Sequence, residues 1–295
     1  MTTPEAHSHP GEDDRLSAAE WFAQGRNAER TGDLRAGRDA YDRAIALDPG
    51  HAEWHYRLGC VWRKLGDLHA AAGAFQRAVE LESGGGRYLT NLGATLDRLG
   101  QRTAAVRAYQ KAILNSPDSA EAHHNLGAIY AEEGRTAEAI RSFEAAIAVS
   151  PDAEGYHNLG LVHYSEGMYE QALECFEACL RHSVDYPLGH YFAGLCLMKN
   201  GLYVKAIERF REAYRLNSRL VRVHFYIGTC LHKTGRYQEA LTNLQRALEA
   251  LPDDGKVHYQ LALTYDALRM PLEARRHFRT ARTAKHSAKH GTARA

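Results

Sequence analysis

Histidine is the residue type with the most evident chemistry in this chain. The sequence has 17 histidines in 295 residues, and five recur at one place of successive segments: His55, His123, His190, His224 and His258. Imidazole binds zinc and related metals, but all ligands of one ion lie about 2 Å from it. These histidines are 34 or more residues apart. The spacing therefore indicates a repeated structural position on a helical turn, and we expect no metal site.

Cysteines and catalytic motifs give no sign of chemistry either. Cys175 and Cys179 are four residues apart, and on a helix their Cβ atoms would be about 5–6 Å apart. A disulfide needs about 3.8 Å, so we expect small, reduced side chains. The sequence contains no nucleophile–base pair, no phosphate-binding loop and no paired-carboxylate motif. We predict no catalytic residue, no cofactor and no enzymatic activity.

The elements that position any binding group are short helices in a repeat. One glycine recurs in steps of 33 or 34 residues, at Gly25, Gly59, Gly93, Gly127, Gly160, Gly194 and Gly228. A second follows with the same steps, at Gly32, Gly66, Gly100, Gly134, Gly167, Gly201 and Gly235. Glycine adopts the left-handed conformation that ends a helix without steric cost. The second ladder therefore predicts a helix end, and a turn, in every segment.

Residues 120–151 show the pattern most completely, with His123, Leu126, Gly127, Tyr130, Ala139, Phe143, Ala146 and Pro151 in place. This spacing resembles the tetratricopeptide repeat, with His where that family usually has Trp. The resemblance covers about 18–288 and implies an all-α, right-handed solenoid of tandem helix-turn-helix repeats. A single unit cannot bury its own apolar face, so such units stack in arrays.

Eight units follow from this resemblance: 18–51, 52–85, 86–119, 120–152, 153–186, 187–220, 221–254 and 255–288. The last unit has Ala262 and Arg269 in place of its two glycines and is interpreted as a terminal cap. We expect 1–17 to be a disordered N-terminal tail and 289–295 a short basic C-terminal tail.

Composition limits the function and the compartment. The formal net charge is only +1, so nucleic-acid binding is not expected as the main role. No apolar run is long enough for membrane insertion, and the N-terminal segment lacks the features of a secretory signal. Five cysteines without the spacing of a disulfide-rich domain predict a cytoplasmic protein.

The resemblance implies that the first helix of each unit lines a concave groove. The sixth place of three consecutive units carries an amide, at Asn91, Asn125 and Asn158. An amide both donates and accepts hydrogen bonds, so such a ladder is able to bind the backbone of an extended peptide. It is similar to the asparagine ladder of O-linked N-acetylglucosamine transferases, whose catalytic domain this chain lacks. A general feature of the family, without this role, is the alternative.

The groove is expected to have two chemically different halves. Its charged half contains Arg26, Arg30, Arg57, Arg63, Lys64 and Arg98, and His124 is also expected in the groove. Its apolar half contains His157, Leu161, Tyr164, Tyr191, Leu195, Met198 and Phe225. The matching ligand is a protein or peptide segment with an acidic stretch and apolar anchors. Burial of the same side chains between adjacent helices is the alternative.

The predicted function is a non-enzymatic scaffold for protein–protein interaction. An accessory subunit that presents substrate to an enzyme fits the same pattern. An RNA-binding array fits less well, because acidic residues interrupt any basic inner face: Glu29, Asp97, Glu132 and Asp266. We also expect a mobile junction between the second and third units, where 84–86 is Gly-Gly-Gly instead of a Pro-containing turn.

Overall fold

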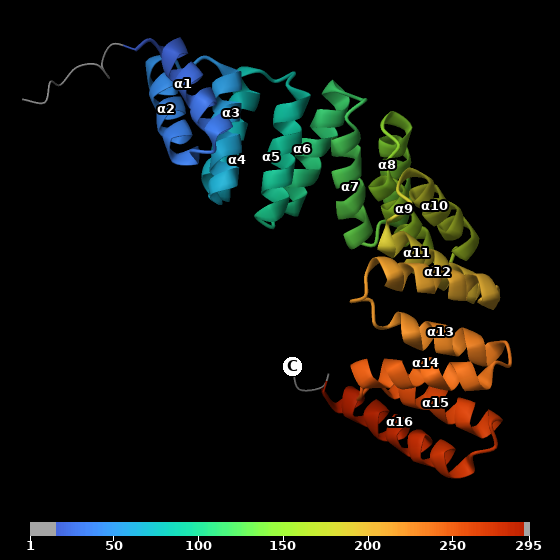
Figure 1. Ribbon diagram of the computed structural model, residues 1–295. Helices are drawn as coiled ribbons and strands as arrows, with labels where there is room; N and C mark the ends of the chain where they lie inside the picture. The colour runs from blue at the N-terminus through green and yellow to red at the C-terminus, as the bar shows by residue number, and fades with distance from the viewer. Residues whose placement is uncertain (1–15, 292–295) are drawn as a thin grey trace, which may run out of the picture. The chain divides into compact units, whose positions relative to one another are not determined.

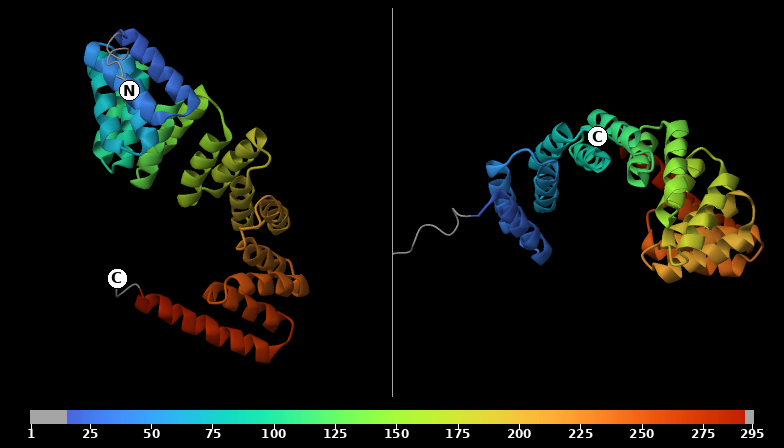
Figure 2. Two further views of the ribbon diagram at one scale, coloured as in Figure 1. Left: turned by 60° about the vertical axis from the view of Figure 1, so that its left-hand side comes forward. Right: turned by 90° about the horizontal axis from the view of Figure 1, so that it is seen from above.

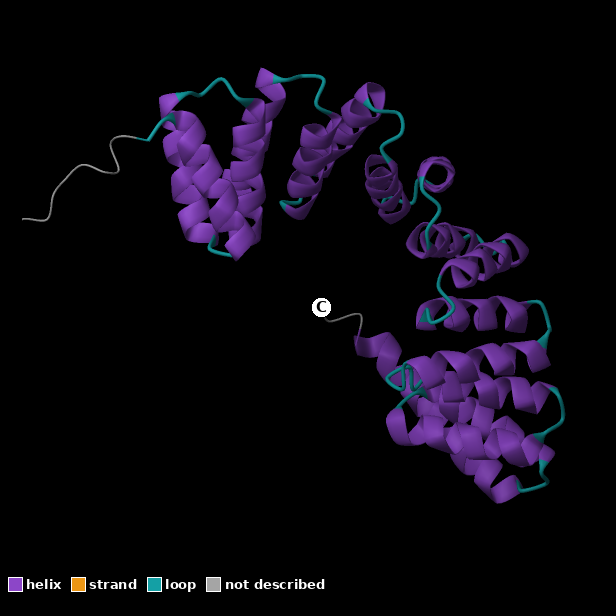
Figure 3. Cartoon of the chain, turned by 45° about the horizontal axis from the view of Figure 1, so that its top comes forward, coloured by secondary structure: helices purple, strands orange, loops and turns teal. Residues whose placement is uncertain are grey.

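The computed structural model describes residues 16–291, with side chains described as far as Ala284. These residues form helices joined by short loops, without a strand in the described part of the chain (Figure 3). Sixteen helices pair into eight hairpins (Figure 1). The prediction of an all-α array of helical hairpins is therefore confirmed. Residues 1–15 and 292–295, which include most of the two predicted tails, lie outside the described residues.

The chain divides into two compact units, residues 1–149 and residues 150–295, and each is described by itself. In the first unit every helix packs on the next one along the chain. Its helices are α1 (Ala18–Thr31), α2 (Leu34–Leu47), α3 (Ala52–Leu65), α4 (Leu68–Leu81), α5 (Gly86–Arg98), α6 (Arg102–Asn115), α7 (Ala120–Glu132) and α8 (Thr136–Val149).

The second unit has the same arrangement of stacked antiparallel pairs (Figure 2). Its helices are α9 (Ala153–Ser165), α10 (Tyr169–His182), α11 (Pro187–Lys199), α12 (Tyr203–Leu216), α13 (Val223–Lys233), α14 (Tyr237–Ala250), α15 (Gly255–Ala267) and α16 (Pro271–Gly291). No described helix of these units is long and apolar enough to cross a bilayer.

The second glycine ladder has the backbone role that the sequence predicts. Its seven glycines have φ between 71° and 91°. At Gly32, for example, the N–H donates to the carbonyls of Ala28 and Glu29, which closes the end of α1. The eighth hairpin makes the same turn at Arg269, with φ 58°, the only described non-glycine residue with a positive φ. Its backbone is therefore strained, because a Cβ atom disfavours this region.

We predict that Arg269→Gly raises the stability of the chain. Relief of the left-handed strain contributes about 1 kcal/mol. Urea unfolding followed by circular dichroism measures the change. Arg269→Ala is the matched control, because it removes the charge but keeps the Cβ atom. An equal gain in both variants would mean that the side chain, and not the backbone, is responsible.

The first glycine ladder allows the two helices of a hairpin to approach closely. A Cβ atom built on Gly59 would lie 2.7 Å from the ring of Phe75, and one on Gly194 would lie 2.8 Å from Phe210. Both rings are fully buried. Any larger residue at these positions would displace the ring, which explains the regular spacing of the ladder.

Two of the three glycines at 84–86, Gly85 and Gly86, have a packing role that the sequence analysis did not assign. A Cβ on Gly85 would lie 2.3 Å from the ring of Tyr88, and one on Gly86 would lie 2.4 Å from Ser116 Oγ. Asn115 Nδ2 donates to the Ser83 carbonyl at 2.7 Å, beside the same turn. The junction lies inside the first compact unit. Greater mobility there stays a prediction.

Candidate functional site

Four of the five recurrent histidines form hydrogen bonds to the turns between hairpins. In four of them Nε2 lies 2.9–3.1 Å from the carbonyl oxygen six residues earlier: His55 to Pro49, His123 to Pro117, His190 to Val184 and His258 to Pro252. A carbonyl only accepts, so Nε2 carries the proton. His224 differs and contacts Asn243 through Nδ1. The repeated position is therefore structural. In the described part of the chain, no group of three or more His, Cys, Asp or Glu residues is arranged to hold a metal.

Two cations of the predicted charged half share one acidic partner. Lys64 Nζ lies 2.8 Å from Glu29 Oε1, and Arg57 Nη1 lies 3.9 Å from Glu29 Oε2. The Tyr41 hydroxyl donates to the same carboxylate at 3.1 Å. Arg57 Nε also donates to Glu53 at 2.8 Å. Burial raises the pKa of Glu29, but the bonds from Lys64 and Tyr41 outweigh it and lower the pKa. The carboxylate is therefore ionised at neutral pH and compensates these cations.

The other members of the charged half have different surroundings. The Arg63 guanidinium lies over the Phe75 ring, 5.8 Å from its centroid, and Arg98 is exposed near the end of α5. His124 is half-buried, edge-on to Phe143. The first unit thus has fewer uncompensated cations than its sequence suggests.

The predicted asparagine ladder is partly used within the fold. Asn91 is buried, and its Nδ2 donates to the Arg87 carbonyl at 2.9 Å. Asn125 is half-buried. Asn158, in the second unit, is half-buried. The amide donor of Asn91 is therefore occupied by its own helix.

The predicted apolar half separates into buried and half-buried side chains. His157 and Leu195 are each only 5% exposed. Leu161, Tyr164, Tyr191, Met198 and Phe225 keep part of their surface exposed. Only the second group is accessible to a partner in the described structure.

Five half-buried rings form a continuous contact series along α9, α11 and α13. Tyr164 lies 5.9 Å from Phe192, which lies 5.2 Å from Tyr191. Tyr191 lies 5.9 Å from Tyr226, and Tyr226 lies 5.2 Å from Phe225, all between centroids. We name these five residues the aromatic row. Phe192 and Tyr226 stand at the sixth place, where earlier units carry Asn, and the sequence analysis did not include them.

His157 gives the second unit a pH-dependent stability. Burial lowers its pKa to about 4, and Nδ1 has no partner among the described residues. The unfolded chain binds the proton near pH 6.5, so this contribution is complete above pH 6.5 and is lost as the pH falls toward 4.

Between pH 6.5 and pH 4, we expect the free energy of unfolding of the parent to fall by about 3 kcal/mol more than that of the His157→Phe variant. The variant keeps a ring between Phe176, Tyr186 and Phe192 but does not titrate. Urea unfolding at a series of pH values measures the difference. If the free energy of unfolding depended on pH in the same way in the two proteins, this assignment would be contradicted.

A pocket of about 950 Å³ lies at the end of the second unit, between α13, α15 and α16. Its apolar wall contains Phe225, Tyr259, Phe278, Ala281 and Ala284, and Gln260 lies among them. Its charged margin contains Asp253, Asp254, Lys256 and Arg282. The sequence analysis treated this hairpin as a cap and missed the pocket.

Stacked helical hairpins with glycine–ring contacts define an α-helical repeat protein, and sequence comparison identifies the repeat. Models of the tetratricopeptide repeat match residues 22–85, 90–154 and 153–186, together more than half of the chain. The chain belongs to the tetratricopeptide repeat family. Residues 187–247 match the model of anaphase-promoting complex, cyclosome, subunit 3. No match was found among curated protein sequences.

Solved structures with the same fold include MamA, with 24% identity over 57% of this chain and 92% of MamA, at a TM-score of 0.54. YrrB is described as a TPR protein with an unusual peptide-binding site. It has 20% identity over 63% of this chain and 96% of the YrrB chain, at a TM-score of 0.59. The C-terminal part of a TPR protein from Cytophaga hutchinsonii has 14% identity over 81% of this chain and 99% of its own chain, at a TM-score of 0.68. These likenesses show the fold.

Proposed function

We propose that this chain is a non-enzymatic scaffold that binds a protein or peptide segment through the first helices of its hairpins. The aromatic row of α9, α11 and α13 is the main contact surface. The observation that carries the proposal is the continuity of the row: five rings touch one another in series, and each keeps part of its surface exposed.

Half-exposed aromatic surface favours association because a partner removes it from water. Tyr and Phe present large, rigid contact areas, and such residues contribute strongly at protein interfaces. The likeness to YrrB, whose description names a peptide-binding site, supports a peptide ligand. The partner segment should therefore carry apolar anchors.

An acidic stretch in the partner is the second part of the proposal. Arg63 and Arg98 are its contacts in the first unit, since Arg57 and Lys64 already share Glu29. Charge pairs of this exposed kind mainly affect the rate of approach and its dependence on salt. The apolar anchors should set the lifetime of the complex.

The test compares how two double variants bind a partner that is recovered by pull-down. Tyr191→Ala with Phe225→Ala should weaken binding by about tenfold or more, mainly through faster dissociation. Arg63→Glu with Arg98→Glu should mainly slow association. Tyr156→Ala is the matched control, a half-buried tyrosine of α9 outside the row. If the aromatic double variant is folded and binds as the parent does, the row is not the site.

A reducing, cytoplasmic compartment completes the proposal. The five cysteines, all within the described residues, form no disulfide. Burial raises the pKa of Cys179 to about 11 and the pKa values of Cys196 and Cys230 to about 12. Such thiols are protonated and unreactive at neutral pH, consistent with packing residues in a compartment where disulfides are rare.

A further inference from the structure

We propose that His258 and His277 form a pH-sensitive switch between α15 and α16, which holds the two helices together at neutral pH and releases them in acid. His258 lies in the first turn of α15, and His277 lies in the second turn of α16. Their Nδ1 atoms are 2.9 Å apart, and their ring centroids are 5.1 Å apart. We name these two residues the histidine pair. The proposal does not depend on the aromatic row.

The Pro252 carbonyl fixes which nitrogen of His258 carries the proton. His258 Nε2 lies 2.9 Å from this oxygen, and a carbonyl only accepts, so the neutral ring is protonated on Nε2. His258 Nδ1 is therefore an acceptor, and the Nδ1–H of His277 donates to it. This hydrogen bond exists only while one of the two facing nitrogens lacks a proton.

The histidine pair tolerates one added proton but not two. The first added proton binds at His277 Nε2, which points away from the shared bond and leaves it in place. The second must bind at His258 Nδ1, because this is the remaining lone pair. Two N–H groups of two cations then face each other, and both hydrogen bonding and charge oppose the contact. The doubly protonated pair should therefore separate.

Burial makes this protonation unfavourable while the hairpin is closed. His258 is 8% exposed, and His277 is half-buried with its ring stacked on Tyr265, 5.4 Å between centroids. Burial lowers the pKa of His277, and the charges of His258 and Arg276 lower it further. The released rings bind protons near pH 6.5. The closed state is therefore favoured fully above pH 6.5 and loses this contribution as the pH falls below it.

The charged groups around the histidine pair do not compensate a second proton. Asp254, the N-cap of α15, is already paired with Arg222 at 3.0 Å. Glu273, in the first turn of α16, is exposed to water, which screens its charge. Arg276 on the same helix opposes protonation. From α14, the neutral Gln245 donates to the hydroxyl of the stacked tyrosine at 3.5 Å.

The preceding hairpin has the same contact without a second titrating group. There, His224 Nδ1 lies 3.4 Å from Asn243 Oδ1, and these residues are 19 apart in the chain, as are the two members of the histidine pair. An amide has both a donor and an acceptor, so it pairs with either protonation state of an imidazole. His277→Asn therefore keeps a partner for His258 and removes the pH dependence of the contact.

The experiment compares hydrogen exchange of the full chain at pH 7 and pH 5, expressed as protection factors. In the parent, protection of α15 and of residues 271–284 should fall about tenfold more than in His277→Asn, because one unit of pKa difference is tenfold in the equilibrium. His182→Asn is the matched control, an exposed histidine at the end of α10, and should behave as the parent. Titration of His157 affects all three proteins equally.

Nitrogen NMR of the histidine rings is the second measurement and needs only the parent chain. At pH 7 it should show His258 protonated on Nε2 and His277 protonated on Nδ1. An equal fall of protection in the parent and in His277→Asn would overturn the proposal. So would a spectrum at pH 7 in which both rings are protonated on Nε2 alone, because the shared hydrogen bond would then be absent.

Discussion

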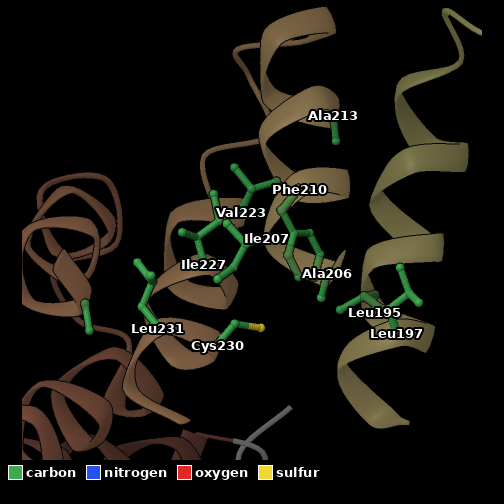
Figure 4. Close-up of a cluster of buried hydrophobic side chains, with 11 residues drawn as sticks. Leu195, Leu197, Ala206, Ile207, Phe210, Ala213, Val223, Ile227, Cys230 and Leu231 are labelled. Carbon is green, nitrogen blue, oxygen red and sulfur yellow. The ribbon is translucent and has the colours of Figure 1, made fainter. Parts of the chain in front are cut away.

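Replacing Phe210 with alanine should lower the free energy of unfolding of the second unit by about 3–5 kcal/mol. The ring is fully buried in a cluster built from α11 to α14 (Figure 4). It lies against Gly194, where an added Cβ would be only 2.8 Å away, and stacks on Tyr226 at 5.3 Å. Its removal leaves a cavity where two hairpins meet, and helices fixed by glycine contacts have little freedom to close it.

Urea unfolding followed by circular dichroism measures this loss. Val204→Ala is the matched control, because Val204 lies on the same helix, α12, and is 59% exposed. It should change stability by less than about 0.5 kcal/mol. A similar small change for Phe210→Ala would show that the cluster does not hold the unit together.

Replacing Glu29 with alanine should destabilise the first unit by about 2–3 kcal/mol. Glu29 joins three helices, because it accepts from Tyr41 of α2 and pairs with Lys64 and Arg57 of α3. Its loss leaves the hydroxyl of a fully buried tyrosine without this acceptor and removes the carboxylate that Lys64 and Arg57 share.

Double-mutant analysis distinguishes these causes. Tyr41→Phe removes the hydroxyl, so the cost of Glu29→Ala should be smaller in that background. Glu80→Ala is a control on an exposed, helix-surface pair with Arg77, and should have little effect. Equal costs for Glu29→Ala in the parent and in the Tyr41→Phe variant would rule out coupling through the hydroxyl.

The repeat and its hairpins were predictable because they depend on local backbone requirements. A positive φ at Gly134 and a close ring at Gly127 each exclude most other residues, so the requirement appears directly in the sequence. The role of Gly85 and Gly86 was not predictable in this way. It depends on Tyr88 and on Ser116, which follows the next helix along the chain.

The candidate site was harder to predict because exposure depends on neighbouring helices. His157 and Tyr191 stand at the same repeat place, yet the first is buried and the second half-buried. Glu29 and Lys64 are 35 residues apart, and no local pattern indicates their pairing. The pocket between α13, α15 and α16 was missed because degenerate repeat glycines suggested a cap, although its aromatic residues Tyr259 and Phe278 stand in the sequence.

Hydrogen exchange of the full chain, with and without the partner recovered by pull-down, tests the central proposal most directly. The account predicts that bound partner slows exchange in the first helices of the second unit, at 153–165, 187–199 and 223–233, and that Tyr191→Ala with Phe225→Ala removes this protection. Protection confined to the second helices of the hairpins, or to residues 16–149, would contradict it.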